Sequence, residues 1–74
     1  MRHFRRRAAE RYDLRLTDMQ IRYLQEVAAA APIIEIQDGG EVRRVPFAGR
    51  EMVVVTKKGM LVTALPEHWE RFGR

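Results

Sequence analysis

The stretch EMVVVTKKGMLVTAL, residues 51–65, decides the fold. Its first part, EMVVVT (51–56), contains a continuous apolar run, MVVV, and is rich in β-branched residues, which is typical of a central strand that is buried on both faces. KKG (57–59) turns the chain, and MLVTAL (60–65) is a further strand that Pro66 ends. Because the turn between the two strands is short, we expect them to pair in antiparallel orientation.

Two more strands precede this pair. IIEIQ (33–37) is strand-like, DGG (38–40) is a turn signal, and EVRRVPF (41–47) is a second strand. Pro46 lies near its end, where a missing backbone donor is tolerated. AGR (48–50) is the turn that leads into residues 51–56. The four strands therefore form an antiparallel β-meander.

The segment before Pro32 has a helical period instead. Residues 3–12 predict a short helix, because Phe4, Ala8 and Tyr12 fall on one stripe at 100° per residue. A second helix begins after Thr17, a natural N-cap that forms a capping box with Gln20.

The pattern as a whole predicts an α+β fold, in which two N-terminal helices pack on one face of a four-stranded antiparallel β-meander. Residues 1–74 make one compact domain, with a core that is small because the chain is short. The residues expected in this core are Ile21, Leu24, Val27, Ile34, Val53, Val55 and Val62.

Several classes of protein are excluded by what the sequence lacks. There is no cysteine, which removes disulfides and thiolate zinc sites, and no serine, which removes a Ser-His-Asp triad. Phosphate-loop, dinucleotide, metalloprotease and EF-hand motifs are absent. No apolar run approaches the roughly 18 residues of a membrane span. We therefore expect a cytoplasmic protein with no cofactor, no metal and no membrane partner; the sequence leaves the oligomeric state open, and we favour a monomer.

The net charge of +4 is concentrated at one end of the chain. Residues 1–15 contain six arginines against Glu10 and Asp13, whereas residues 16–74 contain eight basic and eight acidic side chains. The entire excess therefore falls on the first segment. Such polarity is typical of proteins that bind nucleic acid or acidic proteins.

The first helix also offers side chains with suitable chemistry. His3, Arg7 and Arg11 form one ridge, which joins a group that titrates near neutral pH to two permanent cations. A histidine can move a proton and arginines can hold a phosphate as it gains charge, which suits RNA cleavage. The alternative is an ordinary solvated basic face.

Other residues are candidates for contacts with nucleic acid. The remaining basic ones are Arg2, Arg5, Arg6, Arg43, Arg44, Lys57 and Lys58. Arg43 and Arg44 are consecutive on a strand and point to opposite faces, so one can join a basic surface while the other pairs with Glu35 or Glu51.

Three further side chains in the last part of the chain have two readings each. Trp69 and Phe72 can stack on bases, but we expect them to fold back and cap the small core. Thr63 is either a strand former on a half-exposed face or a hydroxyl that is offered to a phosphate.

A family resemblance follows from short motifs spread over residues 3–66. His3 and Arg7 are followed by ERY (10–12), LT (16–17) and, in the last strand, LVTALP (61–66). This pattern resembles small phage and prophage proteins, which are similar in layout to the barnase–colicin–RelE group of metal-independent ribonucleases. The resemblance implies an active site made of His3, Arg7, Arg11 and Thr63.

Two functions from different classes remain open at this point. The first is a small basic phage-type protein that binds RNA through its N-terminal helix, with RelE-like ribonuclease activity as the implied chemistry. The alternative is a phage-encoded regulator that binds an acidic surface of a host machine, such as RNA polymerase or a defence nuclease. A structural or assembly role is a third reading.

Overall fold

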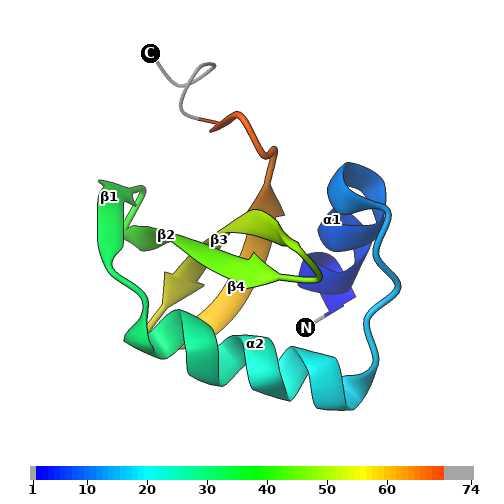
Figure 1. The fold of residues 1–74 in the computed structure, drawn as a ribbon. Coiled ribbons are helices and arrows are strands. Elements are labelled where there is room, and N and C mark those ends of the chain that lie inside the picture. Colours follow the sequence, from blue (N-terminus) through cyan, green and yellow to red (C-terminus); the bar gives the residue numbers. More distant parts are fainter. Residues whose placement is uncertain (1, 70–74) are drawn as a thin grey trace.

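Two helices precede a four-stranded sheet, and the predicted α+β arrangement is confirmed. The computed structural model describes residues 2–69, with side chains from residue 3 onward. The elements, in order, are α1 (Arg2–Tyr12), α2 (Asp18–Ala30), β1 (Ile33–Gln37), β2 (Gly40–Phe47), β3 (Arg50–Lys57) and β4 (Met60–Leu65). The strands pair in the order β1-β2-β3-β4, all antiparallel, and both helices lie beside the sheet (Figure 1).

Each strand connection is a tight turn of two residues, and both of these residues have positive φ. The turn between β2 and β3 is an example, with φ 54° at Ala48 and 75° at Gly49. Asp38–Gly39 and Lys58–Gly59 follow the same pattern. Turns in which both residues have positive φ match the right-handed twist of the flanking strands. Glycine adopts positive φ without steric cost, and it is the second residue of each turn.

Helix α2 has the N-terminus that its sequence predicts. The Thr17 hydroxyl accepts the backbone N–H of Gln20, and the Gln20 side chain accepts the backbone N–H of Thr17. These two bonds satisfy donors that the helix cannot pair internally. The helix ends at Ala30, shortly before Pro32.

The main core lies between the helices and one face of the sheet, which we call the inner face. Phe4, Ala8 and Tyr12 of α1 and Leu24 of α2 are fully or almost fully buried there. The sheet residues that meet them are Val45, Met52, Val54, Leu61 and Ala64. The predicted apolar stripe of the first helix is therefore confirmed.

A second, smaller cluster covers the opposite face of the sheet, which we call the outer face. Val42, Val53 and Val55 pack there with Trp69, which is only 7% exposed. The predicted role of Trp69 as a cap on the core is confirmed, whereas Phe72 lies outside the described residues. Because β3 has a core on both faces, the run Met52–Thr56 is buried throughout.

The predicted core is correct except at one position. Ile21, Leu24, Val53 and Val55 are buried, and Val27 and Val62 are partly buried against the two clusters. The prediction that Ile34 is buried is wrong, because 42% of this residue is exposed. It lies on the edge strand β1, where the strand register shifts between Ile33 and Glu35. Within residues 2–69, neither helix is long and apolar enough to cross a membrane.

Candidate nucleic-acid interface

Helix α1 turns a polar side to solvent. Phe4, Ala8 and Tyr12 point into the core, and the side chains on the opposite side of the helix are exposed. His3, Arg6 and Glu10 are among these exposed residues. The same 3.6-residue period that buries one stripe therefore presents the other to a partner. Arg2 belongs to α1, but its side chain lies outside the described part of the chain.

The arginines of α1 are not equivalent. Arg5 donates to the Leu16 carbonyl at 2.6 Å and pairs with Asp18, so it ties α1 to the start of α2. Arg7 pairs with Glu10 at 2.9 Å, one turn further along the same helix. Such an exposed ion pair contributes little to stability, which leaves Arg7 able to exchange its partner.

Arg6 and Arg11, the other two arginines of α1 whose side chains the structure describes, keep their charge uncompensated. Arg6 forms no hydrogen bond or ion pair within the described residues and is exposed. Arg11 donates to the neutral carbonyl of Ala64 at 3.4 Å, which leaves its positive charge without a counter-ion. We call Arg6, Arg7 and Arg11, together with His3, the α1 face.

The arginines of the sheet, in contrast, each have an acidic partner. Arg44 lies 3.7 Å from Glu51, as the sequence predicts for one of the two consecutive arginines. Arg50 lies 3.3 Å from Glu67. The uncompensated charge of the described chain is therefore richest on its N-terminal segment.

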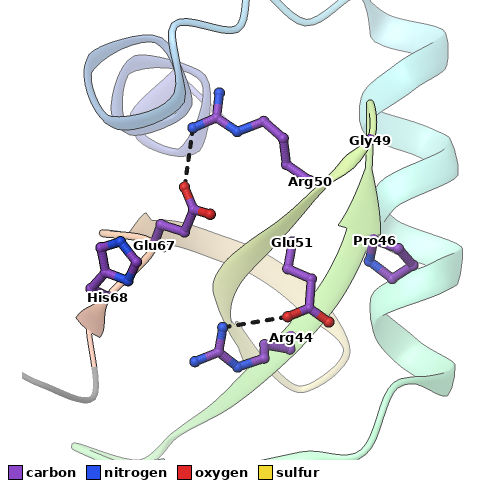
Figure 2. A pocket seen from close by; sticks show the side chains of 7 residues that line it. All are labelled: Arg44, Pro46, Gly49, Arg50, Glu51, Glu67 and His68. Atoms are coloured by element: carbon purple, nitrogen blue, oxygen red, sulfur yellow. Dashed lines mark hydrogen bonds and ion pairs between the residues drawn. The ribbon is translucent and has the colours of Figure 1, made fainter.

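A hollow of about 600 Å³, open to solvent, lies beside these two pairs. Figure 2 shows Arg44 and Glu51 on one side of it, with Arg50, Glu67 and His68 on the other. Two guanidinium groups face two carboxylates here, so their charges cancel. A polyanion gains little attraction from such a site, since it has to displace a carboxylate from each arginine.

Arg50 also holds the end of α1. Its guanidinium donates to the backbone carbonyl of Tyr12 at 2.8 Å and lies over the Tyr12 ring, 5.1 Å from the ring centre. The Tyr12 hydroxyl accepts the Val53 N–H at 3.0 Å and donates to the Leu65 carbonyl at 2.6 Å. Burial raises the pKa of Tyr12 above its ordinary value of 10.0, although the bond from Val53 acts in the other direction.

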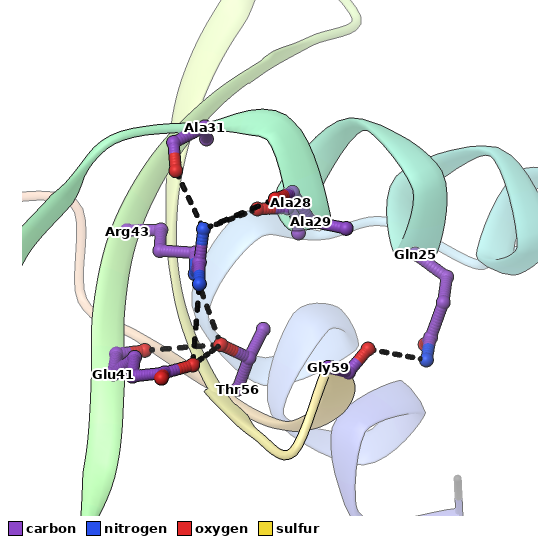
Figure 3. A network of polar contacts seen from close by, with 8 residues as sticks. All are labelled: Gln25, Ala28, Ala29, Ala31, Glu41, Arg43, Thr56 and Gly59. Atoms are coloured by element: carbon purple, nitrogen blue, oxygen red, sulfur yellow. Dashed lines mark hydrogen bonds and ion pairs between the residues drawn. The ribbon is translucent and has the colours of Figure 1, made fainter.

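Arg43 has a structural position that its sequence context does not reveal. Figure 3 shows its guanidinium beneath the end of α2, where it donates to the carbonyls of Ala28 at 3.0 Å and Ala31 at 2.6 Å. A cation at a helix C-terminus satisfies carbonyls that lack a partner in the helix and complements the helix dipole. Only 11% of the Arg43 side chain is exposed.

The other side of the same guanidinium completes a polar network. It donates to the Thr56 hydroxyl at 3.0 Å and to Glu41 at 3.2 Å (Figure 3). Hydrogen bonds from Arg43 and then Thr56 lower the pKa of Glu41 below its ordinary value of 4.5. With every side of the group engaged, Arg43 is a cap of α2, and we leave it out of the nucleic-acid surface.

The four residues of the expected active site are not brought together. His3, Arg7 and Arg11 belong to α1, which packs against the inner face. Thr63 pairs with Val55, a member of the outer cluster, so it lies on the outer face of the sheet and is half-buried. The sheet itself separates the Thr63 hydroxyl from the α1 face.

The two predicted lysine contacts lie at the end of the sheet. Lys57 is the last residue of β3 and Lys58 begins the turn to β4; both are exposed. Neither forms a hydrogen bond or an ion pair within residues 2–69. They form a small basic site separate in sequence from the α1 face. In the same described region, no group of three or more His, Cys, Asp or Glu residues is placed to hold a metal ion.

Comparisons with protein-family models, with curated proteins and with solved structures gave no match. The resemblance to phage proteins and to the barnase–colicin–RelE group therefore stays a prediction. Arg50, Glu67 and His68 are the residues that the sequence does not single out. Arg50 directly follows a turn signal and the other two follow Pro66, but no local pattern shows that these segments meet.

Proposed function

We propose that this protein binds RNA through the α1 face. The observation that carries the proposal is the distribution of compensated and uncompensated charge. Arg43, Arg44 and Arg50 of the sheet each lie beside a carboxylate, whereas Arg6 and Arg11 of α1 do not. Lys57 and Lys58 are uncompensated as well, but residues 1–15 carry the entire net charge of +4, so long-range attraction for a polyanion originates mainly from this segment.

The residue type supports a phosphate partner. Arginine carries a permanent charge and a planar fork of donors that matches two phosphate oxygens, which lysine does not. The α1 face presents Arg7 and Arg11 one helical turn apart, and Arg6 lies about 100° around the helix from Arg7. A helix surface of this kind follows a nucleic-acid backbone without reading its bases.

Cleavage of the RNA has less support than binding. The residues that the resemblance implies lie on both sides of the sheet, so His3 and Thr63 do not share a phosphate in this arrangement. The proposal is therefore a binding protein, in which His3 contributes a contact at the rim of the α1 face.

The test is fluorescence anisotropy with a labelled single-stranded RNA of about 20 nucleotides, at several salt concentrations. Three engaged arginines predict a slope of log K against log salt of about −2, since each neutralised phosphate contributes about −0.7 on single strands. The double variant Arg6→Gln/Arg7→Gln is expected to lose most of the affinity. Its charge-matched control, Lys57→Gln/Lys58→Gln, is expected to keep it.

The alternative class, a regulator that recognises an acidic protein surface, predicts a different result. Such a protein binds polyglutamate of equal charge about as well as it binds RNA. Equal affinity for both probes, or equal loss in both double variants, contradicts the RNA proposal. The same contradiction follows if wild-type protein fails to bind RNA at low salt.

A further inference from the structure

The two edges of the sheet differ in whether side chains hydrogen-bond to their outward-facing backbone groups. Along β4, the Gln25 side chain accepts the N–H of Leu61 at 3.2 Å and donates to the Gly59 carbonyl at 2.8 Å. Arg11 donates to the Ala64 carbonyl of the same strand. Side chains from both helices thus occupy the edge at β4, which prevents another strand from pairing there.

Within residues 2–69, the isoleucines at the edge of β1 have no such protection. No side chain of the described residues hydrogen-bonds to the backbone of Ile33, Ile34 or Ile36. These three isoleucines are 48%, 42% and 63% exposed, and they are half of the six large apolar residues that are exposed in the described chain. A β-branched, apolar and uncovered edge strand is a template for pairing with another strand.

The register of β1 fixes which groups a second strand meets. Gln37 pairs with Gly40 across a two-residue turn, and such a closing pair exchanges both of its hydrogen bonds. Because the direction of backbone groups alternates along a strand, the N–H and C=O of Ile36 point away from β2, toward the free edge. Ile36 itself pairs with Glu41 on the inner face, whereas Glu35 pairs with Val42 on the outer face.

We propose that β1 pairs with β1 of a second copy of this chain, antiparallel and centred on Ile36, to form a weak symmetric dimer. In this register Ile36 faces Ile36 of the other copy, and Glu35 faces Gln37 of the other copy twice, once on each side of the axis. A carboxylate opposite an amide is a favourable cross-strand pair. The register centred on Glu35 instead places two carboxylates directly opposite each other, which is destabilising.

The charge distribution is compatible with this partner. Helix α1, with its uncompensated arginines, packs against β4 at the other end of the sheet (Figure 1). Pairing through β1 therefore places the two basic helices at opposite ends of one eight-stranded sheet, where their repulsion is screened. The contact is smaller than the roughly 1,600 Å² of a standard interface, so we expect a dissociation constant between about 10 µM and 1 mM.

The test is sedimentation equilibrium of the purified chain from about 10 µM to about 1 mM. The expected result is a mass that rises from 8.7 kDa toward twice that value as the concentration increases. Ile36→Lys is expected to raise the dissociation constant at least about tenfold, since charge on an edge blocks strand pairing. The matched control is Met19→Lys, which adds the same charge at a 77% exposed residue of α2 and leaves the dimer intact.

Two variants of Gln37 test the register itself. Gln37→Lys places an ammonium opposite each Glu35 and is expected to tighten the dimer about threefold; Gln37→Glu is expected to weaken it by a similar factor. A chain that stays monomeric at about 1 mM overturns the proposal and leaves the edge to a strand of another protein. A dimer that none of these β1 variants changes overturns it as well.

Discussion

Replacing Arg43 by methionine tests the structural account at its most informative residue. Methionine keeps the aliphatic stem and removes the guanidinium, which leaves the Ala31 carbonyl without its side-chain donor and the Ala28 carbonyl with only the backbone N–H of Ala31. Hydrogen bonds from a charged donor are worth about 1.5–3 kcal/mol each. Water reaches part of the vacated site, because carbonyls at a helix end are near the surface, so we take about 2–4 kcal/mol for the two bonds together.

Chemical denaturation in urea, followed by circular dichroism, measures this loss. A domain of this size has a total stability of about 4–11 kcal/mol, so the variant should unfold at a clearly lower urea concentration. Arg43→Lys is expected to recover only part of the loss, since an ammonium lacks the planar fork. Arg22→Met, which removes a charge from the exposed side of α2, serves as the control and should change stability by less than about 0.5 kcal/mol.

The same variant separates a structural role from a binding role. At a temperature where Arg43→Met is folded, its affinity for RNA should equal that of the wild type within about twofold. A variant that is as stable as the wild type refutes the capping argument. A folded variant that loses its RNA affinity refutes the assignment of Arg43 to the interior of the fold.

Three further predictions concern the polar contacts, and a fourth concerns one close approach. The lowered pKa of Glu41 stabilises the folded protein at pH values above the unfolded pKa of about 4.5, and this stabilisation is lost as the pH falls through the folded pKa. Glu41→Gln lacks this titrating group. Its melting temperature should therefore depend less on pH, between 7 and 3, than the melting temperature of the wild type. The raised pKa of Tyr12 has the opposite sign: its contribution to stability is fully present below pH 10 and is lost as the pH rises further. The phenolate absorbance of Tyr12 should therefore appear at a higher pH in the folded protein than in the urea-unfolded protein. Tyr12→Phe should cost about 1–3 kcal/mol in urea denaturation, because the buried Val53 N–H loses its acceptor. Gly40→Ala should also destabilise the protein, since an added Cβ lies 2.7 Å from Val55 Cγ1. The added Cβ of Gly39→Ala meets no neighbour, so this variant is destabilised only by the positive φ at that position. Equal losses of stability in the two variants would contradict the role of the close contact with Val55.

The local features of the fold follow from the sequence because they depend on neighbouring residues. The capping box of Thr17 and Gln20 spans one helical turn, and the buried run of β3 is a continuous apolar segment. The error at Ile34 has a different origin. Composition cannot distinguish an edge strand from a central one, since that depends on which strand has two neighbours.

The roles of the arginines are less visible, because they depend on distances across the fold. The strand period shows that Arg43 and Arg44 face opposite sides, but not which of them meets the end of α2. Likewise, Tyr12 is recognisable as a core residue, but the two bonds of its hydroxyl join α1 to β3 and β4, more than 40 positions away. The separation of Thr63 from the α1 face follows from the pairing register of β4, which the sequence of that strand does not fix alone.

The most direct measurement of the central proposal is a titration of ¹⁵N-labelled protein with a short single-stranded RNA, followed by amide chemical shifts. The RNA proposal predicts that the largest shifts occur at the α1 face, at His3, Arg6, Arg7 and Arg11, and disappear at high salt. Amides of β1 and of the hollow beside Arg44 and His68 should move little. Shifts that are largest around that hollow, with α1 unchanged, would contradict the proposal.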